Sequence, residues 1–263
     1  MPVDRTQPIG APIWFELATT GQDAAKTFYS DLFGWTFSDD AIDGNGVYTI
    51  FQRDDRDVAA CYTMMADEVA QGLPPHWNVY FRVDDCDAST EKVRAAGGTV
   101  LVEPFEVMEH LRMAVVADPE GAPFCLCQLR AHKGVGIIHE LNTVGWVELA
   151  TRDVARAEAF YKAIFGWSLA DHPGGAPTVY RIFSVQGESQ GGLLQMTSEW
   201  GNMPSHWAIY LRVNDVDAVL AKAQTLGGSV AVPAFDAPGV GRIAMMSDPA
   251  GAHAYLIMLT PSE

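Results

Sequence analysis

Alternating side-chain character over residues 13–19 predicts a β-strand, because successive side chains of a strand point to opposite faces. The two faces are Ile13, Phe15 and Leu17 on one side and Trp14, Glu16 and Ala18 on the other. Apolar residues then recur at helical spacing, which predicts a helix of about 12 residues. The apolar stripe of this helix is Ala25, Phe28, Tyr29, Leu32 and Phe33. We expect Thr19 or Thr20 to cap its start and Gly34 to end it.

A second strand and helix follow the same pattern. Residues 76–83 have an apolar face and a mixed face, and the mixed face is His76, Asn78, Tyr80 and Arg82. A helix is predicted from Asp85 or Asp87 to Ala96, where Gly97 and Gly98 stop it. Other apolar segments predict short strands at 47–51, 58–64, 99–102, 112–117 and 123–129. The pattern therefore predicts two βαβββ modules in this half of the chain.

The second half of the chain repeats the first. A shift of 132 residues brings 13–35 onto 145–167 with 11 of 23 positions identical, including Glu16 and Glu148. A shift of 130 brings "HWNVYFR" onto "HWAIYLR" and "DPEGA" onto "DPAGA". We therefore predict two homologous domains at 8–130 and 142–261, joined by a linker at 131–141. Each domain contains two βαβββ modules.

Composition and charge narrow the function. The 263 residues are 48% hydrophobic and 19% charged, which is typical of a globular protein, and no apolar run is long enough to span a bilayer. The N-terminus has no signal-peptide pattern, so we expect a cytoplasmic protein. The formal net charge of −16 disfavours nucleic acid and anionic membranes and favours neutral or cationic small molecules. The four cysteines indicate small buried thiols.

These motifs together resemble the vicinal-oxygen-chelate superfamily, which includes glyoxalase I, bleomycin-resistance proteins and extradiol dioxygenases. The motifs are "FYSDLFGW" and "FYKAIFGW", each followed by a Gly-Gly helix stop and by "DPEG" or "DPAG". The resemblance covers nearly the whole chain twice and is closest to tandem two-domain members. It implies an α+β fold in which two modules form a cupped, mostly antiparallel sheet, with helices on the convex side and the site on the concave side.

The resemblance also implies positions for metal ligands, and here the chain departs from the pattern. Those positions fall on Trp14, Trp146, Asn78, Ala208, Cys125 and Tyr255. Indole and alanine cannot bind a metal, whereas a catalytic site needs about three convergent N or O ligands. We therefore expect no cofactor. A divalent metal held by Glu16 and His76, by Glu148 and His206, or by ligands shared between domains is the less favoured alternative.

The mixed strand faces supply the candidate site residues, because the uniformly apolar faces should pack on the helices. Glu16 and Glu148 are candidate general bases or anchors for a ligand cation, with His76 and His206 as hydrogen-bond partners. The expected ligand-binding residues are Trp14, Asn78, Tyr80, Arg82, Cys125, Trp146, Tyr210, Arg212 and Tyr255. The structural alternative pairs Glu16 with Arg82 or His76 and Glu148 with Arg212 or His206.

Three functions fit these residues. The favoured one is a metal-independent protein that holds a small molecule in one or both cups, in the manner of bleomycin-resistance proteins. The second is a glyoxalase-like lyase or isomerase, or an oxygenase, that uses Glu16 or Glu148 as base on a small oxygenated metabolite. The third is an interaction module whose cups have no ligand. The internal duplication favours a monomer, with a weak homodimer as the alternative.

Overall fold

A computed structural model of the chain describes residues 7–42, 46–172 and 178–260. The elements of the first half are β1 (Pro12–Thr19), α1 (Gln22–Phe33), β2 (Thr36–Ile42), β3 (Gly46–Arg53), β4 (Arg56–Thr63), α2 (Ala66–Ala70), β5 (His76–Arg82), α3 (Cys86–Ala95), β6 (Thr99–Val107), β7 (Leu111–Ala117) and β8 (Pro123–Leu129). Those of the second half are β9 (Val144–Thr151), α4 (Val154–Phe165), β10 (Ser168–Asp171), β11 (Tyr180–Val185), β12 (Glu188–Gln195), the 3₁₀ turn η1 (Ser198–Trp200), β13 (His206–Arg212), α5 (Val216–Thr225), β14 (Ser229–Ala237), β15 (Gly241–Ser247) and β16 (His253–Leu259).

Strands of the described residues form two eight-stranded mixed sheets. Their orders are β2-β3-β4-β1-β5-β8-β7-β6 and β10-β11-β12-β9-β13-β16-β15-β14. In each module the first strand runs parallel to the last, and the later strands pair antiparallel. The predicted α+β class and the fourfold βαβββ pattern are confirmed.

The chain divides into two compact units that interleave along the sequence. The middle unit contains Met1–Trp14, Val79–Gly134 and Trp146–Ala208, and so combines most of the second and third modules. The terminal unit contains Phe15–Asn78, Val135–Gly145 and Ile209–Glu263, and so combines most of the first and fourth modules. The domain bounds at 8–130 and 142–261 and the linker at 131–141 remain predictions.

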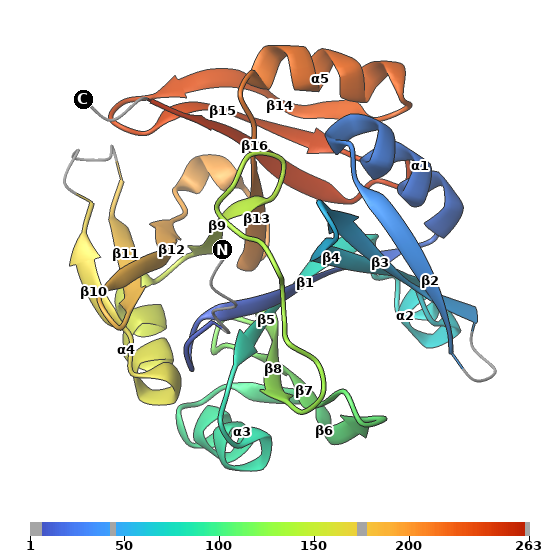
Figure 1. Cartoon of the computed structure of the whole chain (residues 1–263). Helices are drawn as coiled ribbons and strands as arrows, with labels where there is room; N and C mark the ends of the chain where they lie inside the picture. The colour runs from blue at the N-terminus through green and yellow to red at the C-terminus, as the bar shows by residue number, and fades with distance from the viewer. Residues whose placement is uncertain (1–6, 43–45, 173–177, 261–263) are drawn as a thin grey trace. The chain divides into compact units, whose positions relative to one another are not determined.

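Helices α1, α3, α4 and α5 each contact strands of their own module, as their apolar stripes require. In the terminal unit α5 contacts β14, β15 and β16, and it lies along β14 and β15 in Figure 1. In the same unit α1 contacts β2, β4 and α5. In the middle unit α3 contacts β6, β7, β8 and α4. The helices therefore also join the two modules of each unit.

A buried hydrogen-bond chain joins the modules at these helix contacts. In the middle unit Trp207 Nε1 donates to the Tyr161 hydroxyl at 2.9 Å, and that hydroxyl donates to Asp118 Oδ2 at 3.2 Å. The matching chain of the terminal unit is Trp77, Tyr29 and Asp248, with distances of 3.3 and 3.3 Å. Burial raises the pKa of both tyrosines well above 10.0 and the pKa of both aspartates above 3.8. The Tyr of each "FY" motif therefore binds the Asp of a "DPxG" turn.

The second glycine of each Gly-Gly stop permits close packing at the same contact. A Cβ atom at Gly98 would lie 2.8 Å from the Phe160 ring and 2.7 Å from the Ala117 carbonyl oxygen. A Cβ atom at Gly228 would lie 3.0 Å from the Phe28 ring. A side chain at either position would push the neighbouring helix away, so these glycines do more than stop a helix.

Some local predictions were wrong. The N-cap of α1 is Gly21 and not Thr19 or Thr20, and it has no side-chain cap bond. The Thr19 hydroxyl instead accepts a hydrogen bond from the Gly21 amide at 3.2 Å. Strand β2 was not predicted, because its sequence "TFSDDAI" is exposed and does not alternate. The left-handed Gly34 at the end of α1 and the Asp85 cap of α3 are confirmed.

Candidate functional site

Glu16 lies buried in β1 of the terminal unit and is hydrogen-bonded to a tyrosine. Its side chain belongs to a residue that is 8% exposed, and the Tyr48 hydroxyl of β3 donates to its Oε1 atom at 2.7 Å. The strand β4 lies beside it, with Ala60 as the register partner of Glu16. Glu16 is thus a buried carboxylate that accepts a hydrogen bond from the phenol of Tyr48.

Glu16 and Tyr48 lie on the sheet face that points away from α1. The neighbours of Tyr48 along β3 point toward the helix, since Thr49 accepts a hydrogen bond from Gln22 at 2.8 Å and the Phe51 ring contacts Tyr29. Successive side chains of a strand alternate, so Tyr48 must point to the opposite face. The predicted placement of Glu16 away from the helical cover follows from this contact.

Glu148 of the middle unit repeats this arrangement with an added indole. It lies in β9, is 6% exposed and is hydrogen-bonded to Tyr180 of β11. The Tyr180 hydroxyl also accepts a hydrogen bond from Trp146 Nε1 at 2.9 Å. Burial, and then the charge of Glu148, raise the pKa of Tyr180 well above 10.0. Tyr180 is therefore a neutral phenol throughout the physiological range.

This pair too points away from its helix. Arg181, the next residue along β11, forms an ion pair with Glu158 of α4 at 3.0 Å. The Phe183 ring stacks on Trp167 at 3.8 Å on that same helical side. Tyr180 and Ile182 therefore point to the other face, together with Glu148.

The arginines and histidines expected beside the glutamates bind backbone carbonyls. Arg82 Nη1 donates to the Gln7 carbonyl oxygen at 2.5 Å, and Arg212 Nη1 donates to the His139 carbonyl oxygen at 2.7 Å. The His76 and His206 rings place Nδ1 at 2.8 and 2.9 Å from the carbonyl oxygens of Pro74 and Pro204. The predicted pairing of the glutamates with these arginines and histidines is therefore wrong among the described residues. Each glutamate is hydrogen-bonded to a tyrosine instead.

The remaining predicted ligand-binding residues lie in four local environments. Tyr210 and Tyr255 are register partners of β13 and β16 and stack with ring centroids 4.4 Å apart. Tyr80 and Cys125 are the matching partners of β5 and β8, and both are buried. Trp14 is 1% exposed and meets the His132 ring edge-on at 4.5 Å. Half-buried Asn78 lies in β5.

These residues do not fit a catalytic metal. The positions implied by the resemblance hold indole, amide, alanine, thiol and phenol groups. Cys125 is the strand partner of Tyr80, and the Tyr255 ring stacks on Tyr210. Among residues 7–42, 46–172 and 178–260 no three His, Cys, Asp or Glu side chains gather closely enough to hold an ion. We therefore derive no chemistry through a metal.

Sequence reasoning missed the two tyrosines that bind the glutamates. Their signal is nevertheless present, because the shift of 132 residues brings "VYTIF" at 47–51 onto "VYRIF" at 179–183. The same shift brings Ala60 onto Gly192 and Val58 onto Gln190. Extending the repeat past the first helix would have identified both phenols.

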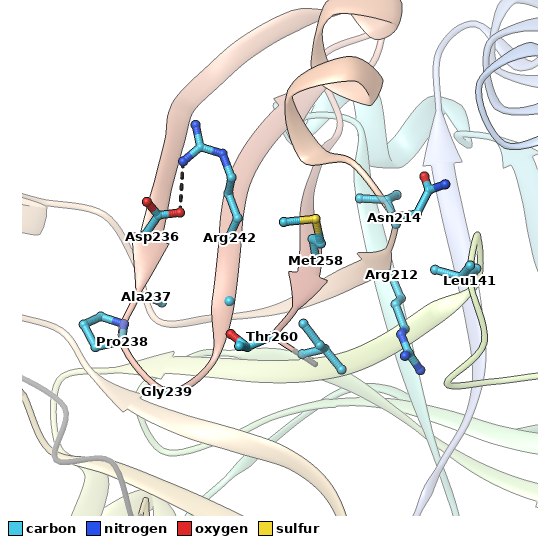
Figure 2. Close-up of a pocket in the computed structure, with 13 residues that line it drawn as sticks. Leu141, Arg212, Asn214, Asp236, Ala237, Pro238, Gly239, Arg242, Met258 and Thr260 are labelled. Carbon is cyan, nitrogen blue, oxygen red and sulfur yellow. Dashed lines mark hydrogen bonds and ion pairs between the residues drawn. The ribbon is translucent and has the colours of Figure 1, made fainter. Parts of the chain in front are cut away.

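A separate hollow of about 650 Å³ opens beside Arg212 in the terminal unit. Figure 2 shows it between Leu141, the strand ends near Met258 and the turn from Asp236 to Gly239. Arg242 at its side is paired with Asp236 at 3.0 Å and with Asp217 at 2.6 Å. Since its arginines already have partners, the hollow is a weaker candidate than the two carboxylate faces.

Comparison with known proteins shows what the chain is similar to. A model of the "Glyoxalase-like domain" matches residues 14–127, and a model of the "Glyoxalase/Bleomycin resistance protein/Dioxygenase superfamily" matches residues 143–254. "Putative glyoxylase CFP32" of Mycobacterium tuberculosis is 37% identical over 97% of both chains. "Anthracycline biosynthesis protein DnrV" of Streptomyces peucetius is 37% identical over 92% of this chain and 91% of that protein.

Solved structures show the same fold at low identity. The Mn(II)-bound glyoxalase from Novosphingobium aromaticivorans has a TM-score of 0.62 and 16% identity, with 95% of this chain and 82% of that chain covered. The 2,3-dioxygenase LapB from Pseudomonas sp. KL28 has a TM-score of 0.64 and 14% identity, with 95% and 93% covered. At this identity the likeness concerns architecture. Among the described residues, no helix has the length and apolar content that a membrane crossing requires.

Proposed function

Because the chain belongs to the glyoxalase/bleomycin resistance protein/dioxygenase superfamily, we propose that it binds a small neutral or cationic molecule on the sheet faces that carry Glu16 and Glu148. The observation that carries the proposal is the buried carboxylate, hydrogen-bonded to a phenol, on the helix-free face of two modules. A buried carboxylate costs roughly several kcal/mol unless it is paired. Each can accept a hydrogen bond from a ligand hydroxyl or ammonium group.

The charge and the donor set support binding without a metal. The net charge of −16 raises the local concentration of cations and repels anions. The side chains beside the carboxylates are phenols and an indole, which suit flat or cationic ligands and not metal ions. The names of the relatives refer to glyoxylase activity and to anthracycline biosynthesis, which favours a small organic molecule.

A thermal-shift screen in the presence of a chelator tests this proposal. The compounds should include neutral and cationic small molecules and an anthracycline. A ligand at 100 times its dissociation constant should stabilise the protein by about 2.7 kcal/mol. Stabilisation that requires added metal, or no stabilisation by any compound, would contradict metal-independent binding.

Matched variants locate the site. Glu16→Gln and Glu148→Gln should each leave the protein folded and weaken a cationic ligand by about tenfold or more, since a charge-assisted bond contributes roughly 1.5–3 kcal/mol. Glu188→Gln removes the same charge from an exposed position of β12 and serves as the control. Equal weakening by all three variants would indicate a long-range charge effect instead of a contact.

A general-base role is the second candidate, favoured by the burial of both carboxylates on the faces where a ligand would lie. A glyoxalase-like lyase, isomerase or oxygenase would use Glu16 or Glu148 to remove a proton from a small oxygenated metabolite. Deuterium incorporation next to the carbonyl of hydroxy-ketones in D₂O, followed by NMR, tests this step. The Gln variants should lower the exchange rate by about 10²-fold or more and retain binding of a neutral ligand.

A further inference from the structure

The short helix α2 is attached to the Glu16 face of the first module. Tyr62 of β4 is the register partner of Tyr48 on β3 and of Ala18 on β1. Register partners point to the same face of a sheet, so Tyr62 shares the face of Tyr48 and Glu16. The Tyr62 hydroxyl donates to Glu68 Oε1 of α2 at 2.8 Å. This hydrogen bond therefore joins α2 to the sheet beside the Glu16–Tyr48 pair.

Apolar burial contributes little to the attachment of α2. None of the five residues of this helix is buried. Met65, Val69 and Leu73 follow one another at a spacing of four residues and are 47%, 49% and 45% exposed. Helices in proteins are stabilised mainly by a packed apolar face, which α2 does not have. The hydrogen bond from Tyr62 to Glu68 therefore carries much of the attachment.

The chain is anchored on either side of this helix. Before it, Met64 is 6% exposed, and its amide donates to the Thr19 carbonyl oxygen at 2.9 Å. After it, Trp77 is buried, and its Nε1 atom donates to the Tyr29 hydroxyl at 3.3 Å. Residues 65–73 therefore form an exposed segment between two fixed points.

The matching segment of the third module is held by a different device. The shift of 132 residues brings 65–73 onto 197–205. The Arg152 guanidinium donates, at 2.7 to 3.0 Å, to three carbonyl oxygens of that segment, those of Thr197, Gly201 and Met203. Thr20 stands at the position of Arg152 in the first module, and Leu194 stands at the position of Tyr62 in the third. The first module therefore uses a phenol–carboxylate bond where the third uses an arginine.

We propose that residues 65–73 are a lid whose latch is the Tyr62–Glu68 hydrogen bond. The lid lies at the Glu16 face, so the inference rests on the proposed function and adds the regulation of one of its two faces. While the latch is closed, the Tyr62 hydroxyl donates to Glu68. When the latch opens, that hydroxyl can donate instead to a ligand held beside Glu16 and Tyr48. Such a donor is specific to the first module.

Hydrogen exchange of the full chain without a ligand, followed by mass spectrometry, tests the lid. In the wild type, amides of 65–73 should exchange at least about tenfold faster than those of 197–205. Tyr62→Phe removes the latch and should speed exchange of 65–73 about tenfold further, as expected for a hydrogen bond to a charged group. Tyr48→Phe removes the other phenol of the same face and should leave this segment unchanged. Arg152→Ala should speed exchange of 197–205 alone.

Chemical labelling of Tyr62 tests what the latch controls. N-acetylimidazole acetylates accessible phenols, and peptide mass spectrometry locates the product. Glu68→Ala removes the acceptor that holds the Tyr62 hydroxyl and should raise acetylation of Tyr62 about tenfold. Asp67→Ala removes the same charge from the exposed neighbouring residue and should leave acetylation unchanged.

Circular dichroism and thermal unfolding establish that each variant is folded. Exchange of 65–73 that Tyr62→Phe leaves unchanged, or equal acetylation of Tyr62 in Glu68→Ala and the wild type, would overturn the inference. Neither measurement involves a ligand. The response of ligand binding to Glu16→Gln therefore remains a separate test of the proposed function.

Discussion

The Glu16 face and the Glu148 face share a buried glutamate and a tyrosine but differ in the residues around them. The Glu148 face adds the hydrogen bond from Trp146 and has Gly192 beneath the Tyr180 ring. The Glu16 face has Ala60 at the position that corresponds to Gly192. The two faces therefore share the hydrogen-bonded glutamate and tyrosine, and they differ in shape where one has Gly192 and the other has Ala60. The two faces need not bind the same molecule.

The largest expected effect concerns the Trp–Tyr–Asp hydrogen-bond chain, which each unit contains once. Tyr161→Phe removes the hydroxyl that accepts a hydrogen bond from Trp207 and donates one to Asp118. The buried indole N–H and the buried carboxylate then each lose a hydrogen-bond partner. We expect the free energy of unfolding to fall by about 3 kcal/mol. Tyr29→Phe should cost less, because its indole bond of 3.3 Å is longer than the 2.9 Å bond to Tyr161. Urea unfolding of both variants tests the order, and a larger loss at Tyr29 would contradict it.

The next effect distinguishes the two faces at Gly192 and Ala60, the residues that lie beside the glutamates on the neighbouring strands. Gly192→Ala forces the Tyr180 ring to move, so the free energy of unfolding should fall by about 2 kcal/mol, as overpacking usually does. Ala60→Gly should cost only about 0.5–1 kcal/mol through backbone entropy. Urea unfolding compares the two variants. Equal losses would mean that the two tyrosines pack alike and that the contrast between the faces is unfounded.

A smaller effect is expected at a carboxylate that only the middle unit has. Burial alone would raise the pKa of Glu120, but hydrogen bonds from Thr151 and Ser205 outweigh it and hold that pKa below 4.5. This stabilisation is present above pH 4.5 and is lost as the pH falls through the lowered pKa. Glu120→Gln should reduce the free energy of unfolding by about 1 kcal/mol at neutral pH. The same measurement on Ala250→Gln, at the matching position of the repeat, should change by less than about 0.5 kcal/mol.

The smallest effect concerns Asp118, whose pKa shift is opposite in direction to that of Glu120. Burial raises the pKa of Asp118 above 3.8, so the folded state binds more protons than the unfolded state just above that pH. Stability contributed by this group therefore falls as the pH rises from 3.8 through the raised pKa. Asp118→Asn should flatten this decline and change stability at neutral pH by less than about 1 kcal/mol. Chemical unfolding from about pH 4 to about pH 7 measures the slope, and an unchanged slope would contradict the assignment.

Strand alternation made the fold and the faces predictable. Side-chain parity correctly turned Glu16 and Glu148 away from the helices, because this depends only on local geometry. The partners of the glutamates were not predictable in that way, since Tyr48 lies 32 residues from Glu16 along the chain. Arg82 and His76 were predicted as partners because they share a face of β5, yet Arg82 binds the Gln7 carbonyl oxygen and His76 lies at hydrogen-bond distance from that of Pro74.

The helix contacts show a second limit. The "DPxG" segments were interpreted only as turns, although Asp118 and Asp248 also accept hydrogen bonds from tyrosines of other modules. Pairings of this kind depend on how modules associate, and neither hydrophobic periodicity nor turn propensity reports that association. The exposed strand β2 was missed for a simpler reason, because strands without a buried face do not alternate.

The interleaved units have a consequence for biosynthesis. Tyr29 binds Asp248, a residue synthesised 219 positions later, so the first module emerges from the ribosome long before its helix partner exists. Contacts this distant slow folding, and the apolar surface of the early segment stays uncovered in the meantime. Splitting the gene within 131–141 would yield two half-chains, and each module would then be separated from the module with which it forms a unit. We expect such half-chains to aggregate or to reassociate with one another.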